Sequence, residues 1–406
     1  MLPVLLLLLL SLLLVSAVGG DTAGGVASPL SDEEAVAHGN MARLLDGYDD
    51  GMYKTMRDDA PRTAAYAAAI QRLAPGKVVL DIGTGQFALL ASIAAKAGAR
   101  YVYAIEGNRQ AFERAKMAVA EQNLTDRIGV LYGYSANVSL QDLPPPSSAD
   151  GAAAESTEWP GVQLVIHELL GEIAGMEGAA YAIADAHRRH IAPSTTQHRG
   201  VEAPRVSVPY GARTFIAPTA FPSPEYWSQL PVPVIMTPGT TFLKLWEFPT
   251  QSLLSDWQEF ETLEFDRPET LSTVSTKVLT FRVVAVDGHN SNGNNEHGDD
   301  CGEEVEPKSD GLPFAGFVCY MDVDLVAQGA REIDTLRDKT HWAQQMVLFE
   351  STTVFPGDVI TLETTVDNTQ GPFTVYTFEA SVDGSSEDGG TSKRRSLGRV
   401  VLDEHF

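Results

Sequence analysis

The stretch KVVLDIGTGQFALLASIAAKAG, residues 77–98, decides the fold of the first half of this chain. Its residues 77–82 form an apolar run that is typical of a buried strand, and residues 87–98 have the pattern of a helix that ends at a glycine. Further strand-like and helix-like segments alternate after it, at residues 101–106, 109–123, 128–132 and 162–168. This alternation predicts a parallel sheet with helices on both of its faces.

The turn inside this stretch has the features of a nucleotide-binding turn. Gly83 and Gly85 permit a tight bend and let backbone N–H groups approach a ligand, and the following helix N-terminus favours an anionic group. Asp81 precedes the turn and Glu106 ends the next strand, where a carboxylate can accept both hydroxyls of a ribose. No Walker lysine is present and the third glycine of a dinucleotide fingerprint is missing, so an ordinary Rossmann-like turn with a capping acid stays open as an alternative.

A second stretch, ELLGEIAGME at residues 168–177, follows the apolar run at 162–168 and carries three acids. Carboxylates are costly to bury and are paired with a cation when they are buried. Glu168 and Glu177 are therefore either solvated or capping acids, or they meet a positive group. We expect Glu172 to be solvated and His167 to pack against the sheet.

The pattern changes near Pro193, after which short strand-like runs alternate with Pro and Gly turns. The sequence thus predicts two domains: an α/β domain over residues 39–192, opened by helices, and an antiparallel sheet or barrel over residues 193–406. Residues 287–311 are acidic and lack periodicity, and we expect a disordered loop there. Its histidines and Cys301 match no ordinary metal-site spacing, so no metal is expected.

The N-terminal residues 1–19 form an apolar run that predicts a signal peptide or a signal anchor, and residues 20–38 have the composition of a linker. The leader predicts the secretory pathway or an organelle, with membrane attachment only if it stays uncleaved as an anchor. Without a working leader, the expected location is the cytoplasm or nucleus.

The charge balance limits the partners. Among 406 residues, 54 acids oppose 29 bases, which gives a formal net charge of −25. Nucleic acid binding needs a basic face and is therefore not expected. The negative field favours a basic protein or peptide, unless the acids serve only solubility.

Four separate motifs, taken in order, resemble those of the protein arginine N-methyltransferase family. They are YKTMRDDAPRT at 53–63, GKVVLDIGTG at 76–85 with AIE at 104–106, ELLGEIAGME at 168–177, and KTHWAQQMVLFE at 339–350. The resemblance implies a Rossmann-like methyltransferase domain followed by an antiparallel β-barrel. It also implies transfer of a methyl group from S-adenosyl-L-methionine to arginine in a protein substrate.

The resemblance assigns roles at the cofactor end by position. Arg62 would pair with the cofactor's carboxylate, since a guanidinium fork suits a carboxylate, and Met56 would lie near the sulfonium. The remaining cofactor positions would be the strand-end acids, the turn glycines and the adenine edge: Asp81, Glu106, Gly83, Gly85 and Ser135. The turn departs from the family pattern because Phe87 stands where a small residue is expected.

At the substrate end, the resemblance implies that Glu168 and Glu177 grip the substrate guanidinium, which stays protonated and presents planar donors. Asp59 and His341 would hold the two halves together or relay a proton, while Trp342 would pack in the core. Members of the family dimerise through an arm, and residues 221–246 are the corresponding segment, so a homodimer is possible.

Two other functions fit parts of the pattern. A small-molecule methyltransferase would keep Asp81 and Glu106 without needing both Glu168 and Glu177. A non-catalytic methyltransferase-like binding protein would fit the altered cofactor turn.

Overall fold

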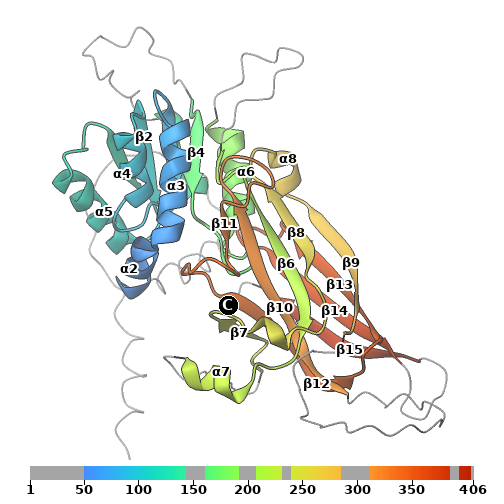
Figure 1. Ribbon diagram of the computed structural model, residues 1–406. Helices are drawn as coiled ribbons and strands as arrows, with labels where there is room; N and C mark the ends of the chain where they lie inside the picture. The colour runs from blue at the N-terminus through green and yellow to red at the C-terminus, as the bar shows by residue number, and fades with distance from the viewer. Residues whose placement is uncertain are drawn as a thin grey trace, which may run out of the picture.

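The computed structural model describes residues 50–142, 161–191, 207–230, 239–284, 311–384 and 393–403 (Figure 1). The predicted leader, the linker and Cys301 lie outside the described residues, as does the predicted acidic loop apart from Gly311. Within the described part, no helix is both long and apolar enough to cross a membrane.

A parallel sheet forms the first layer, with the strand order β3-β2-β1-β4-β5. Its strands are β1 (Val78–Ile82), β2 (Tyr101–Glu106), β3 (Ile128–Tyr132), β4 (Leu164–His167) and β5 (Ser207–Val208). The first four lie within the strand segments expected from the sequence. β5 comes after residue 192, where we expected the first domain to end, yet it pairs in parallel with β4. The parallel sheet therefore continues past that residue.

Helices cover this sheet and precede it, as Figure 1 shows in blue and green. They are α2 (Asp50–Asp58), α3 (Ala60–Leu73), α4 (Leu89–Lys96), α5 (Arg109–Glu121) and α6 (Ala179–Arg189), with the 3₁₀ turns η1 (Ser135–Asn137) and η2 (Leu140–Asp142). Asp59 separates α2 from α3 and caps α3 by accepting the Arg62 N–H. Arg62, Tyr66 and Ile70, spaced four residues apart on one face of α3, are all buried.

Antiparallel strands form the second half. They are β6 (Gly211–Thr219), β7 (Phe242–Leu245), β8 (Gln258–Glu264), β9 (Val274–Arg282), β10 (Leu312–Asp324), β11 (Ile333–Asp334), β12 (Gln344–Val354), β13 (Val359–Asp367), β14 (Val375–Gly384) and β15 (Lys393–Leu402). Short helices lie between them: α7 (Pro224–Gln229), η3 (Thr250–Ser252) and α8 (Pro268–Leu271). One sheet has the order β7-β12-β10-β6-β8 and the other β15-β14-β13-β9. β12 lies beside β15 and β8 beside β9, so the two sheets enclose a barrel-like core.

The long strand β10 joins the two halves, and in Figure 1 it runs from the α/β side to the far end of the barrel. Phe317 and Cys319 pack in the barrel core. Met321 and Val323, further along the same face, pack instead in the core that contains the parallel sheet. Trp342 is buried there too, as predicted. The core around the parallel sheet thus includes side chains from the second half of the chain, so the two halves are packed against each other.

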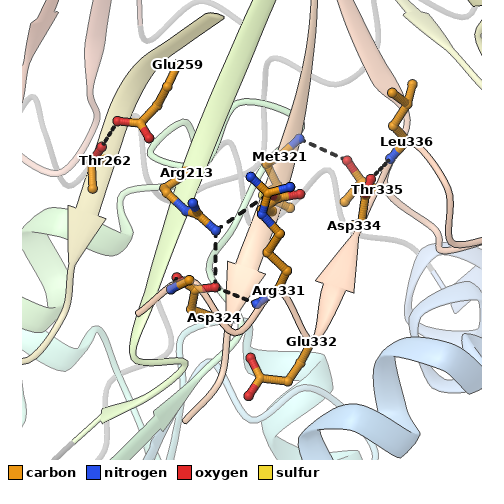
Figure 2. Close-up of polar contacts among 12 residues, drawn as sticks. Arg213, Glu259, Thr262, Met321, Asp324, Arg331, Glu332, Asp334, Thr335 and Leu336 are labelled. Carbon is orange, nitrogen blue, oxygen red and sulfur yellow. Dashed lines mark hydrogen bonds and ion pairs between the residues drawn. The ribbon is translucent and has the colours of Figure 1, made fainter. Parts of the chain in front are cut away.

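A polar cluster fixes the segment between β10 and β12, and Figure 2 shows it on β6, β10 and β11. Asp324 accepts the Arg331 N–H at 2.8 Å and pairs with Arg213 at 3.4 Å. Thr335 donates its N–H to Met321 and its hydroxyl accepts the Met321 N–H, both at 3.0 Å. The chain that leads from β11 to His341 therefore begins from a fixed point on the barrel.

Candidate active site

The turn between β1 and α4 has the conformation that its glycines were expected to supply. Gly83 and Gly85 have φ angles of +75° and +66°, which side chains with a Cβ rarely adopt. The N–H groups of Gly83 and Thr84 both donate to the Ile105 carbonyl at 3.0 Å. The helix begins at Leu89 rather than at Phe87, because Ala88 takes a left-handed conformation just before it. The turn is therefore longer than the sequence pattern predicted.

Asp81 and Glu106 are buried and accept hydrogen bonds from this turn and from the starts of the helices α4 and α5. Asp81 accepts the Thr84 hydroxyl at 2.6 Å and the Ala91 N–H at 3.1 Å. Glu106 accepts the backbone N–H groups of Gly85 at 2.8 Å and Asn108 at 2.7 Å. Burial raises the pKa of Asp81 to about 7 and also raises the pKa of Glu106, although the hydrogen bonds oppose both shifts. Both carboxyl groups thus stand at the same edge of the sheet.

The helix α2 lies against the turn. A Cβ on Gly85 would stand 3.5 Å from the Tyr53 ring, so this ring packs over the turn. Burial, and then the charge of Glu106, raise the pKa of the Tyr53 hydroxyl. Phe87 projects toward α2 and lies 4.8 Å beneath the Arg57 guanidinium. The residue that departs from the family pattern therefore contacts the helix covering the turn.

A buried ion pair links the cofactor-side residues to the double-Glu loop, residues 168–177. Arg62 Nη1 lies 2.6 Å from Glu168 Oε2, with side-chain exposures of 5% and 8%. Arg62 Nη2 also donates to the Met56 carbonyl at 2.7 Å. The sequence interpretation assigned Arg62 to the cofactor and Glu168 to the substrate. The structure brings the two side chains into direct contact.

The double-Glu loop connects β4 to α6 and folds back on itself. A Cβ on Gly171 would stand 2.9 Å from Met176 Cβ and 3.5 Å from Glu177 Cγ, so the end of the loop lies against its beginning. Glu177 is partly buried. Our expectation that Glu172 is solvated is wrong: its side chain is 12% exposed and pairs with Lys244 of β7 at 2.8 Å.

Asp59 and His341 meet although 282 residues separate them. Asp59 Oδ2 accepts from His341 through the backbone N–H at 2.7 Å and lies 2.8 Å from ring Nδ1. Burial alone would raise the pKa of Asp59, but hydrogen bonds from His341 and Arg62 outweigh it and leave the pKa lowered. Trp342 donates its ring N–H to the Leu170 carbonyl at 2.8 Å. The segment before β12 therefore touches both the start of α3 and the double-Glu loop.

Two further residues named in the sequence analysis, Ser135 and His167, make contacts with other parts of the fold. Ser135 begins η1, just beyond β3, and its carbonyl accepts from the Arg189 guanidinium, which also pairs with Asp185. His167 is fully buried and packs edge-on against Phe265, as expected. Burial lowers the pKa of His167 to about 3, so its ring stays neutral.

One set of contacts to the double-Glu loop could not be predicted from the sequence. It comes from three barrel residues: Glu261 and Tyr376 lie against Gly175, and Thr214 accepts the Ala174 N–H. No motif includes these residues, and a buried glutamate inside a strand follows no pattern that we could have used.

Comparisons with known proteins agree with this geometry. No family model matches the chain. It is 29% identical over 157 residues to the probable protein arginine N-methyltransferase 6.1 of Oryza sativa subsp. indica, which covers 38% of this chain and 37% of that protein. It is 31% identical over 160 residues to protein arginine N-methyltransferase 1 of Chlamydomonas reinhardtii, which covers 38% of this chain and 42% of that protein. The chain thus spans less than half the length of these curated relatives.

Solved structures match far more of the chain. Arabidopsis thaliana protein arginine methyltransferase 10 superposes with a TM-score of 0.58 at 18% identity, covering 87% of this chain and 98% of that one. The PRMT1 enzyme-prozyme heterotetrameric complex of Trypanosoma brucei with AdoHcy gives a TM-score of 0.56 at 16% identity, with the same coverage. The fold is therefore a Rossmann-like domain followed by a β-barrel, as the resemblance implied.

Proposed function

We propose that this chain, whose fold is that of the protein arginine N-methyltransferases, methylates a guanidino nitrogen of arginine in a protein substrate and uses S-adenosyl-L-methionine as the methyl donor. One observation carries the proposal. Ile82 pairs with His167 in parallel register, so the next residues, Gly83 and Glu168, leave neighbouring strands at the same edge. The cofactor turn and the first acid of the double-Glu loop are therefore adjacent.

The residues at this edge fit S-adenosylmethionine. Gly83 and Gly85 carry no side chain, so the chain between β1 and α4 can make a tight turn beside Asp81 and Glu106. Glu106 would bind the ribose hydroxyls, Asp81 and Arg62 would bind the amino acid end, and the remaining contacts would come from Met56 and Ser135. When bound, the cofactor supplies an electrophilic methyl carbon whose bond to sulfur breaks as a guanidino nitrogen attacks it.

The acids of the double-Glu loop would orient the substrate. Glu168 already pairs with one guanidinium, that of Arg62, at 2.6 Å, and this contact supports a role for its carboxylate in accepting guanidinium N–H groups. With Glu177 on a second side, a substrate arginine would be held in one orientation, and such positioning lowers the barrier by several kcal/mol, or about a thousandfold in rate. The Asp59–His341 pair would hold α3 against the barrel and receive the proton that the methylated nitrogen releases.

The net charge of the chain and the assembly of a similar protein suggest its substrate and its oligomeric state. The net charge of −25 suits a basic, arginine-containing protein. The Trypanosoma enzyme-prozyme complex is a heterotetramer, and we propose that this chain also associates, as a homodimer, through the segment 221–246 that contains α7. The predicted leader would route the enzyme to the secretory pathway or an organelle.

The proposal is tested with S-adenosylmethionine and an arginine-rich peptide, read by mass spectrometry. We expect a 14 Da increment on arginine with the wild type, corresponding to about one added CH₂, and loss of this product with Glu177→Gln. Unchanged turnover by Glu177→Gln would contradict the role of Glu177. A wild type that binds S-adenosylmethionine but methylates no arginine peptide would favour a small-molecule methyltransferase. Failure of the wild type to bind S-adenosylmethionine in calorimetry would favour a non-catalytic binding protein.

A further inference from the structure

The middle of the double-Glu loop is anchored by a buried carboxylate from the barrel. Glu261 lies on β8 and is only 3% exposed. Its Oε2 accepts the Thr214 hydroxyl at 2.6 Å and its Oε1 accepts the Tyr376 hydroxyl at 2.6 Å. Three strands of the barrel, β6, β8 and β14, thus contribute to one polar group inside an otherwise apolar core.

This group contacts the loop backbone. The Ala174 N–H donates to Thr214 Oγ1 at 3.1 Å. A Cβ on Gly175 would stand 2.5 Å from the Tyr376 hydroxyl and 2.8 Å from Glu261 Oε1, so only glycine fits against the carboxylate. Burial raises the pKa of Glu261, while hydrogen bonds from Thr214 and Tyr376, and then from the Gly175 and Ala174 backbone, act to lower it.

A contribution to stability does not by itself explain why a carboxylate is buried here. A buried carboxylate with its partners is often no more stable than apolar side chains of similar volume, so the charge is better explained by the geometry that it imposes. Ala174 and Gly175 lie between the two acids, three and two residues before Glu177. Fixing these two amides fixes the path on which Glu177 returns toward Glu168.

We propose that Glu261 is a positioning residue for methyl transfer, which sets the spacing of Glu168 and Glu177 by holding the Ala174 and Gly175 amides from the barrel side. This inference rests on the proposed function. It gives the barrel an indirect part in catalysis, since the same carboxylate joins three of its strands to the loop that holds the substrate.

The test compares Glu261→Gln with Glu259→Gln, a matched change on the same strand whose carboxylate is partly exposed and pairs with Lys277. We expect Glu261→Gln to lower kcat for an arginine peptide by about tenfold or more, as for a lost charged hydrogen bond. The KM and dissociation constant for the cofactor should change less than about twofold, and Glu259→Gln should match the wild type within that margin.

A second pair of variants separates positioning from general stability. Thr214→Val removes the hydroxyl that joins Ala174 to Glu261 and should lower kcat, whereas Thr214→Ser keeps the hydroxyl and should restore it. Hydrogen exchange at Ala174 and Gly175 should accelerate in Glu261→Gln while exchange in the parallel sheet stays unchanged. This readout needs no activity, so it tests the anchor even if the wild type methylates no peptide.

Two outcomes would overturn the inference. Faster exchange at Ala174 and Gly175 with an unchanged kcat would show that the anchor does not serve catalysis. Equal acceleration of exchange throughout the barrel and the sheet, with cofactor affinity lost in parallel, would show that Glu261 only stabilises the fold.

Discussion

The cofactor turn and the double-Glu loop lie at one edge of the same sheet, but they are built in different ways. The turn is held by residues close in sequence: Thr84 bonds Asp81, and the Gly85 amide bonds Glu106. The double-Glu loop is held by distant ones, through the Arg62–Glu168 pair and the Trp342 bond to Leu170. Cofactor binding should therefore survive changes that abolish methyl transfer, and mutations can separate the two.

Glu168→Gln should have the largest effect. It removes one of the two acids and leaves the buried Arg62 guanidinium opposite a neutral amide. We expect the single-turnover rate of peptide methylation to fall about a thousandfold, because one of two orienting charges is lost. Breaking a buried pair also costs about 3 kcal/mol of unfolding free energy, which urea denaturation would measure.

Glu172→Gln is the control for this variant. Glu172 lies on the same loop but pairs with Lys244, whose side chain is 46% exposed, so we expect less than about a threefold change in rate. Equal losses in both variants would mean that the loop needs its total charge rather than the specific grip of Glu168.

Gly178→Ala should affect the loop without touching the cofactor turn. Gly178 has a φ of +82°, and a Cβ there would stand 2.1 Å from the Pro372 carbonyl oxygen. Because backbone must move to admit it, we expect methylation to fall about a hundredfold and S-adenosylhomocysteine affinity to change less than about threefold. Calorimetry and single-turnover rates measure the two quantities.

Gly76→Ala is the control for Gly178→Ala, because it introduces similar backbone strain without a steric clash. Gly76 has a similar φ of +73°, but a Cβ there meets nothing within 4 Å. This variant should lose some stability and keep its methylation rate. A parallel loss of cofactor affinity in Gly178→Ala would contradict the independence of the two regions.

The difference between contacts that are close in sequence and contacts that are distant also explains which parts of the site could be predicted from the sequence. Asp81, the turn glycines and Glu106 belong to one strand-turn-helix-strand unit, whose periodicity and glycines indicate its shape directly. Asp59 and His341 are 282 residues apart, and only the resemblance to a family brought them together. Local patterns hold no information on such a pair, because a tertiary fold decides which distant segments meet.

Glu172 and Glu261 show why the surroundings of some side chains could not be predicted from the sequence. Glu172 was expected in solvent because its partner, Lys244, comes from a strand that the sequence does not link to it. Glu261 follows the buried Phe260, and both point inward because the β6–β8 register shifts between Thr214 and Phe215. Strict alternation would place one of the two outside, and a bulge is not visible in the residue pattern.

A pH-dependent effect on stability should arise at the cofactor end. Burial raises the pKa of Asp81 to about 7 in the folded protein, from an ordinary 3.8. Between these values the folded state binds more protons than the unfolded state, so this carboxyl's contribution to stability falls as pH rises and is constant above the folded pKa. Asn cannot ionise, so Asp81→Asn lacks this dependence.

We expect the unfolding free energy of Asp81→Asn, relative to the wild type, to rise by about 2 kcal/mol between pH 5 and pH 7.5. Urea denaturation at both pH values measures it. Other buried acids with raised pKa values, such as Asp322, are present in both proteins and cancel in the difference. A difference that does not depend on pH would contradict the raised pKa.

The smallest expected effect tests whether cofactor binding depends only on residues close in sequence to the turn. The Arg57 guanidinium of α2 stacks on Phe87 at 4.8 Å, in a surface contact that links the cover helix to the turn. Such contacts contribute about 0.5–1 kcal/mol, so Phe87→Ala should weaken S-adenosylhomocysteine binding about threefold in calorimetry. Phe112→Ala removes a similar ring from beneath Arg109 on α5 and should leave the affinity unchanged. Equal affinities for both variants and the wild type would mean that Phe87 does not hold α2, and that the turn needs nothing from outside its own strand-turn-helix-strand unit.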